Sequence, residues 1–327
     1  MNKRERVFNL LDGKPTDRVP AGFWLHFPKN MHHSDAATQA HLDYINQTDT
    51  DILKIMNENL FYTEGGRLYS TEDLPKFRGF TRKDKLFQDQ MEITKRVVDA
   101  TAKNVAVVAT VHGLVASTHH SMGHANRYGE YAYGLVVMLR ENPAPVVKMM
   151  NEVAESLIEL IDCSTASGAD GIYYADLGGE AHLFTDEEFA QYIAPLEKKI
   201  LNHAASKSKL NILHICKANT QLSRYADYNA PIVNWAVHEN KIGLLEGSQK
   251  IFPNSIVLGG FDDRSGILVD GTDEEIASAT NELLDTMEGR PYILGADCTL
   301  PTEIPYAKIR QVVAAAEAQK SHERAHS

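Results

Sequence analysis

Residues 145–176 read PVVKMMNEVAESLIELIDCSTASGADGIYYAD, and this stretch contains the two patterns that decide the fold. Over Pro145–Ser167, apolar residues recur at steps of three and four, which is the spacing of one face of an amphipathic helix. Gly171–Asp176 follows as a short apolar run of the length and composition of a buried strand. A long helix leading into a short buried strand is typical of repeated βα units.

The same alternation continues in both directions along the chain. Eight short apolar runs are separated by longer segments, several of them with helical periodicity. These runs are Val19–Trp24, Asp51–Met56, Val105–Val111, Gly171–Asp176, Asn211–Ile215, Ile232–Val237, Ile256–Phe261 and Tyr292–Asp297. The pattern predicts an α/β fold with a parallel sheet, and the count of eight favours a single TIM-type (β/α)8 barrel over an open sheet. We therefore expect residues 1–327 to form one barrel domain.

Charge and hydropathy exclude several classes of partner. The net charge is −11 and the basic residues are scattered, apart from Lys3, Arg4 and Arg6, so the chain has no basic face for nucleic acid. No window approaches the roughly 18 apolar residues of a membrane span, and the N-terminal residues lack the pattern of a signal peptide. We expect a cytoplasmic protein that binds neither nucleic acid nor membrane.

The strongest local signal is the tripeptide His214-Ile215-Cys216 at the end of the fifth apolar run. Residues i and i+2 of a strand point to the same side, so the imidazole and the thiol should project together. Cys298 follows the eighth run, and in a barrel the carboxyl ends of all strands converge on one face. One imidazole and two thiolates suit zinc, with a fourth position left for a substrate. Zinc bound in this way deprotonates a coordinating thiol and leaves it a nucleophile for alkyl transfer.

Burial in the core is the competing interpretation of these residues. Free cysteine is among the most buried residue types, and Cys163, on the apolar face of its predicted helix, fits that interpretation better. For His214, Cys216 and Cys298, the position at strand ends brings the metal site and the structural role to about equal weight. The residues alone leave both open.

Motifs along almost the whole chain resemble the uroporphyrinogen decarboxylase superfamily. They include Asn2–Val7 with Gly13–Pro20 near the N-terminus, Gly259–Asp262 with Gly271-Thr272, and Gly295–Cys298 leading to Pro301 and Pro305. The resemblance implies a distorted TIM barrel. It also implies one of two chemistries, namely metal-free decarboxylation of a tetrapyrrole or zinc-dependent methyl transfer.

The decarboxylases of this superfamily carry an arginine-rich N-terminal segment that holds the tetrapyrrole. Here that segment reads GFWLHFPK over residues 22–29, without those arginines, and a substrate with eight carboxylates needs several cationic partners. His214, Cys216 and Cys298 instead match the metal signature of the branch similar to methylcobamide:coenzyme M methyltransferases. This resemblance implies Zn²⁺ as cofactor, a methylcobamide supplied by a corrinoid partner protein, and a small-molecule thiol or similar acceptor.

Further residues at strand ends are candidates for the pocket wall. Asp176 and His112 are predicted to be catalytic, because both follow strands and would line the pocket. Asp176 lies where the resembled superfamily carries an acidic residue, so it could orient a metal-bound histidine or contact the substrate, although capping of the next helix explains it about as well. Glu180 and Glu239 are possible fourth metal ligands, whereas His238 and Asp262 are possible wall residues, and a helix cap explains Asp262 better. The long insertions 60–90 and 112–140 are expected to be lids or walls, with His119, His120 and His124 in a polar loop.

Three functions follow, in order of preference. The first is zinc-dependent methyl transfer between a methylated corrinoid protein and a thiol. The second is a uroporphyrinogen decarboxylase-type decarboxylase without metal. The third is a non-catalytic corrinoid-binding or scaffold barrel, which leaves the three converging ligands unexplained.

Overall fold

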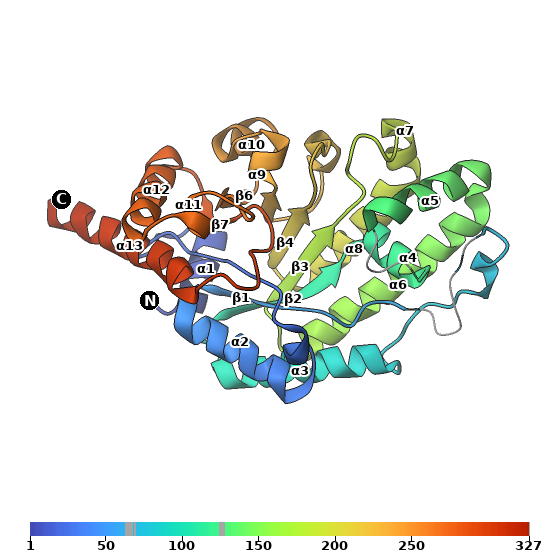
Figure 1. The fold of residues 1–327 in the computed structure, drawn as a ribbon, viewed down its shortest axis with the longest axis horizontal. Coiled ribbons are helices and arrows are strands. Elements are labelled where there is room, and N and C mark those ends of the chain that lie inside the picture. The colour runs from blue at the N-terminus through green and yellow to red at the C-terminus, as the bar shows by residue number, and fades with distance from the viewer. Residues whose placement is uncertain (63–67, 69, 124–127, 327) are drawn as a thin grey trace.

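Parallel strands form the centre of the protein in the structure, a computed structural model that describes residues 1–62, 68, 70–123 and 128–326. The strands are β1 Ile52–Ile55, β2 Ala106–His112, β3 Gly171–Asp176, β4 Leu210–Ile215, β5 Ile232–Trp235, β6 Ile256–Phe261 and β7 Tyr292–Ala296. Within the described residues they make one seven-stranded sheet in sequential order, curled into a half-barrel (Figure 1). Each strand lies within or close to one of the predicted apolar runs.

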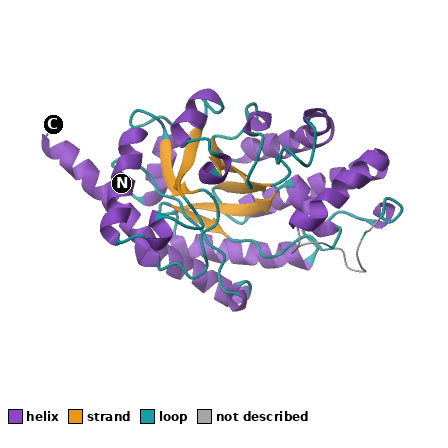
Figure 2. Cartoon of the chain, turned by 45° about the horizontal axis from the view of Figure 1, so that its top comes forward, coloured by secondary structure: helices purple, strands orange, loops and turns teal. Residues whose placement is uncertain are grey.

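Helices enclose the sheet, as Figure 2 shows. The α-helices are α1 Lys3–Leu11, α2 Ser34–Thr48, α3 Lys85–Thr101, α4 Leu114–Ser121, α5 Tyr128–Glu141, α6 Pro143–Ala166, α7 Asp186–Glu188, α8 Ala194–Lys207, α9 Val237–Asn240, α10 Leu244–Lys250, α11 Ile267–Asp270, α12 Asp273–Thr286 and α13 Tyr306–His326. Short 3-10 turns cover Lys29–Met31, Leu74–Lys76 and Leu222–Tyr225, and a π-helical turn covers Phe189–Ile193. Successive contacts link α12, α13, α2, α3, α6 and α8 into one outer layer. Among the described residues, no helix combines the length and apolarity needed to cross a membrane.

The first predicted strand differs from the expectation. Within 19–24 the structure has an isolated bridge, Ala21 to Leu294, in place of a regular strand. The Gly22 N–H donates to the Leu294 carbonyl at 2.8 Å, while the Asp51 N–H donates to the Ala21 carbonyl at 2.8 Å, so the segment lies between β7 and β1. Pro20 has no N–H to donate, which interrupts a regular ladder. A complete eight-stranded barrel is therefore not confirmed.

A buried ion cluster holds this segment in place. Asp51 is fully buried and accepts hydrogen bonds from the Arg18 guanidinium at 2.6 Å and from the Ala21 N–H at 2.8 Å. Arg6 of α1 donates to the same carboxylate. A buried carboxylate with several charge-assisted donors is a satisfied group, so Asp51 fixes the residues before β1 to the start of the sheet.

Two helices begin at Thr-x-x-Glu sequences, the pattern of a capping box. The Thr185 and Thr272 side chains each accept a hydrogen bond from the N–H three residues on. The Glu188 and Glu275 carboxylates in turn accept one from the N–H of the cap residue, so both are complete capping boxes. The helix predicted from Pro145 begins two residues earlier, at Pro143, where proline is tolerated in the first turn.

Candidate metal centre

The register of the sheet decides which side chains can meet. His112, Ala175, His214 and Asn234 are aligned on the neighbouring strands β2 to β5, and aligned residues point to the same face of a sheet. Tyr173 lies two residues before Ala175 and stacks on the His214 ring, with the ring centroids 5.4 Å apart. We call this the inner face; residues of the opposite parity lie on the outer face, toward the helices.

His214, Cys216 and Cys298 come together on the inner face. The Cys216 and Cys298 sulfurs are 3.8 Å apart, and the Cys298 sulfur is 3.3 Å from His214 Nε2. All three ligand atoms lie within 4.8 Å of one another. His214 is buried, whereas both cysteines are partly exposed, so the cluster has its sulfurs toward the open side.

Asn234 fixes the orientation of His214, and the sequence analysis did not identify it. The Asn234 amide nitrogen donates to the Leu258 carbonyl at 2.8 Å and to the Ala296 carbonyl at 3.0 Å, which turns its oxygen toward His214. That oxygen is 2.6 Å from His214 Nδ1 and accepts only from an N–H. Nε2 therefore carries the free lone pair and faces Cys298. An asparagine within an apolar strand was the sequence signal that could have revealed this role.

The two thiols influence each other strongly. Hydrogen bonding from Cys216 and the nearby His214 hold the pKa of Cys298 well below its usual value, although burial opposes this. Conversely, the contact with Cys298 and then burial raise the pKa of Cys216 well above its usual value. The contact between the two sulfurs thus favours the thiolate at Cys298 and the thiol at Cys216.

Lys54 of β1 forms part of the same wall and was also not identified from the sequence. It is aligned with Val108, so it points to the inner face, and its ammonium lies 4.1 Å from the Tyr173 ring centroid. Burial lowers the pKa of Lys54 to about 8, while Cys298, Glu58 and Cys216 oppose this shift. The side chain therefore remains mostly cationic at pH 7.

Asp176 does not join the cluster. It has the parity of Tyr174, so its carboxylate lies on the outer face, where Glu197 of α8 and Tyr225 are its neighbours. Its backbone carbonyl accepts from the Cys216 N–H at 3.1 Å, but it is Asn234 that orients His214. The structure thus places Asp176 behind the wall that carries the ligands.

His112 lies on the inner face, on β2, two strands from His214. Burial, and then the charge of Lys54, lower the pKa of His112 to about 4, so the imidazole is neutral at pH 7. Its ring packs against His120, with centroids 5.5 Å apart. The prediction of a polar loop at His119 and His120 is wrong, because both are buried in α4. His124 lies outside the described residues.

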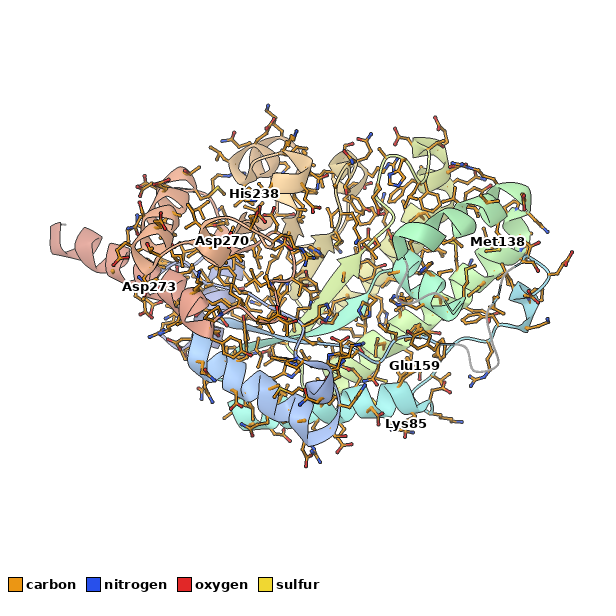
Figure 3. The ribbon with its side chains drawn as sticks, in the orientation of Figure 1. Lys85, Met138, Glu159, His238, Asp270 and Asp273 are labelled. Atoms are coloured by element: carbon orange, nitrogen blue, oxygen red, sulfur yellow. The ribbon has the colours of Figure 1, made fainter. Side chains whose placement is uncertain are left out.

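Of the other candidates, His238 contacts the residue that precedes the ligand Cys298. It projects from α9 (Figure 3) and pairs with Asp297, the residue before Cys298, at 2.9 Å. Glu239 on the same short helix is exposed. Asp262 accepts from the Arg264 and Ser265 N–H groups and so shapes its own turn, while Glu180 is buried and accepts from the Gly178 N–H.

Asp263 is a further acid near the cluster. Burial, and then the charge of Cys298, raise the pKa of Asp263 to about 6, and its carboxylate pairs with Arg264 at 2.9 Å. Cys163 is buried in α6, as its helical position predicted.

Fold and cluster together define a half-barrel protein with a candidate metal centre at the carboxyl ends of its strands. The family model for uroporphyrinogen decarboxylase (URO-D) matches residues 65–319. The chain belongs to the uroporphyrinogen decarboxylase family.

Relatives within this family carry a more specific description. The chain is 22% identical to the methylcobamide:CoM methyltransferase MtbA of Methanosarcina acetivorans over 249 residues, which is 76% of this chain and 69% of the relative. It is 23% identical to the protein of the same name from Methanosarcina mazei over 246 residues, 75% of this chain and 68% of the relative.

Two solved structures show the same fold. A methyltransferase from Methanosarcina mazei superposes with a TM-score of 0.80 at 17% identity, covering 98% of this chain and 99% of that one. A B12-independent methionine synthase from Shewanella sp. W3-18-1 gives 0.59 at 14% identity, covering 94% and 99%.

Proposed function

We propose that this chain is a zinc-dependent methyltransferase that moves a methyl group from a methylated corrinoid protein to a thiol or a similar acceptor. The observation that carries the proposal is the convergence of His214 Nε2 with the sulfurs of Cys216 and Cys298 within 4.8 Å. These three atoms come from two strand ends far apart in the chain, and nothing in core packing requires them to meet.

The donor set fits a zinc ion. Two sulfurs bound tetrahedrally to one ion at about 2.3 Å lie about 3.8 Å apart, and the sulfurs of Cys216 and Cys298 are separated by 3.8 Å. Three protein ligands of this softness leave a fourth position for a substrate. A zinc ion bound there supplies Lewis acidity, which lowers the pKa of a thiol that coordinates to it.

The chain's own residues hold and orient the reacting groups. Asn234 keeps Nε2 of His214 directed at the centre, and Tyr173 packs against the imidazole, so the ligand cannot rotate. In the transfer, a carbon–sulfur bond forms to the acceptor thiolate and the cobalt–carbon bond of the donor breaks, with its electron pair left on cobalt. The thiol proton leaves to solvent.

The relatives support methyl transfer over decarboxylation. Both MtbA proteins are described as methylcobamide:CoM methyltransferases, which implies a corrinoid donor and a thiol acceptor for them. A tetrapyrrole decarboxylase has no use for a metal centre, and residues 22–29 lack the arginines that such a substrate requires.

Metal analysis with a matched pair of cysteine variants tests the proposal. We expect about one zinc per chain, and loss of that zinc together with methyl transfer to 2-mercaptoethanesulfonate in Cys216→Ser. Cys163→Ser removes a thiol outside the cluster and should keep both. Full activity of a zinc-free protein, or decarboxylation of uroporphyrinogen that chelators leave unchanged, would refute the assignment.

A further inference from the structure

Lys54 is a buried cation that forms no ion pair with any residue the structure describes. It is 5% exposed, and among the side chains that the structure describes its ammonium forms neither an ion pair nor a hydrogen bond. Its contacts are two aromatic faces, with ring centroids at 4.1 Å for Tyr173 and 5.5 Å for Trp24. The aromatic faces hold the ammonium in place but accept no conventional hydrogen bond from it.

Two neighbouring donors also lack a hydrogen-bond partner among the described residues. Trp24 is 2% exposed and Tyr173 is 1% exposed, and neither the indole Nε1 nor the phenol oxygen has a hydrogen-bond partner among the described residues. The two rings meet edge to face with centroids 4.7 Å apart. An ammonium, an indole N–H and a phenol O–H therefore lie together beside the His214 ring.

Buried donors of this kind are costly unless an acceptor joins them. An unpaired buried charge loses its hydration without compensation, and the same holds for an N–H or O–H without a partner. Of the acids nearby, Glu58 pairs with His26 at 2.6 Å and Asp263 with Arg264 at 2.9 Å, and neither forms an ion pair with Lys54. The missing partner is a group with several acceptor atoms and a negative charge.

Charge at the metal centre does not remove this requirement. A divalent ion and two thiolates cancel, so a loaded cluster leaves the charge of Lys54 uncompensated. Tyr173 connects the two features, because one ring stacks on His214 and contacts the Lys54 ammonium. A molecule whose sulfur lies at the cluster can thus place a second group beside Lys54.

We propose that Lys54, together with the Trp24 indole N–H and the Tyr173 hydroxyl, binds an anionic group of the methyl acceptor, a carboxylate or a sulfonate. This rests on the proposed function for the identity of the ligand as an acceptor. It makes Lys54 a specificity-determining residue that selects anionic over neutral thiols.

Equilibrium binding to the zinc-loaded protein, followed by calorimetry, tests the proposal with matched thiols. For 2-mercaptoethanesulfonate and 3-mercaptopropionate we expect binding at least tenfold weaker in Lys54→Met than in the unmodified protein, whichever anion is preferred. For 2-mercaptoethanol, which lacks the charge, we expect no change. Tyr173→Phe removes only the hydroxyl and should weaken the anionic thiols severalfold while leaving the neutral thiol unaffected.

Two controls separate this proposal from the proposed function and from misfolding. Zinc content of both variants should match that of the unmodified protein, and neither variant should unfold at a lower temperature than the unmodified protein. Ethanesulfonate, which has no thiol, should bind the unmodified protein and not Lys54→Met, even if the protein transfers no methyl group. Equal weakening of charged and neutral thiols would assign Lys54 to the sulfur site instead, and unchanged binding of every probe would overturn the anion site.

Discussion

The two faces of β3 and β4 carry different kinds of buried polar residue. On the inner face, His214 and Tyr173 border a cluster whose sulfurs are partly exposed. On the outer face, Asp176 and Glu197 are 1% and 0% exposed and lie among tyrosines. Both sets lie near the carboxyl end of the sheet, where a barrel is expected to keep its chemistry. Only the inner set can receive a ligand, so the direction of a side chain decides its role more than its place along the strand.

The carboxyl groups of Asp176 and Glu197 form a buried pair on the outer face. Burial raises the pKa of Asp176 to about 6, and burial followed by the charge of Asp176 raises the pKa of Glu197. The Tyr228 hydroxyl donates to Glu197 at 2.7 Å, and no positively charged side chain among the described residues pairs with either acid. Two such carboxyls do not both ionise at low cost, so the folded protein retains a proton there.

The largest expected effect is on zinc affinity, when the residue that orients His214 is changed and the three ligands are kept. In Asn234→Ala, His214 loses the acceptor that fixes its tautomer, and we expect roughly 10–100-fold weaker zinc binding. Competition with a chromogenic chelator measures this. Asn211→Ala is the control, because Asn211 is a buried asparagine of the neighbouring β4 that bonds only to backbone groups near the other end of the sheet. Equal zinc affinity in Asn234→Ala would remove this residue from the metal centre.

The outer face should govern the pH dependence of stability. A carboxyl with a raised folded pKa keeps a proton that the unfolded chain releases above about pH 4, so stability is full below that value and falls as the pH rises toward 6. One such proton gives a slope of about 1.4 kcal/mol per pH unit in this window. Asp176→Asn removes the carboxyl that titrates in this window and should reduce that slope in urea unfolding measured from pH 4 to 6, with unchanged zinc content. A slope identical to that of the unmodified protein would contradict the shared proton.

The smallest expected effect concerns the hydrogen bond from Tyr228 to Glu197 of the carboxyl pair. Tyr228→Phe removes the donor to Glu197 and should lower the free energy of unfolding by about 1 kcal/mol, the usual net contribution of such a bond. Zinc content and thiol binding should stay the same, since the hydroxyl lies on the outer face. A loss of zinc in this variant would mean that the two faces are coupled.

Much of the fold was predictable because strand and helix periodicity are local properties. All seven strands overlap predicted runs, and the capping boxes at Thr185 and Thr272 are each encoded in four consecutive residues. The segment 19–24 was apolar enough to be predicted as a strand. The structure instead gives it one isolated bridge, because Pro20 has no N–H and the segment divides its hydrogen bonds between β7 and the start of β1. Hydrogen-bond partners of that kind are not encoded in the pattern of one segment.

The sequence by itself determined the order of strands and helices and the pairing of His214 with Cys216, because i and i+2 share a face of any strand. It also marked Cys298 as a residue at a strand end. The tertiary structure alone decided that Cys298 lies beside that pair, that Asp176 points away, and that Asn234 and Lys54 join the site. The physical reason is that sheet curvature and register bring distant strands together, and neither property can be read from the residues of a single strand.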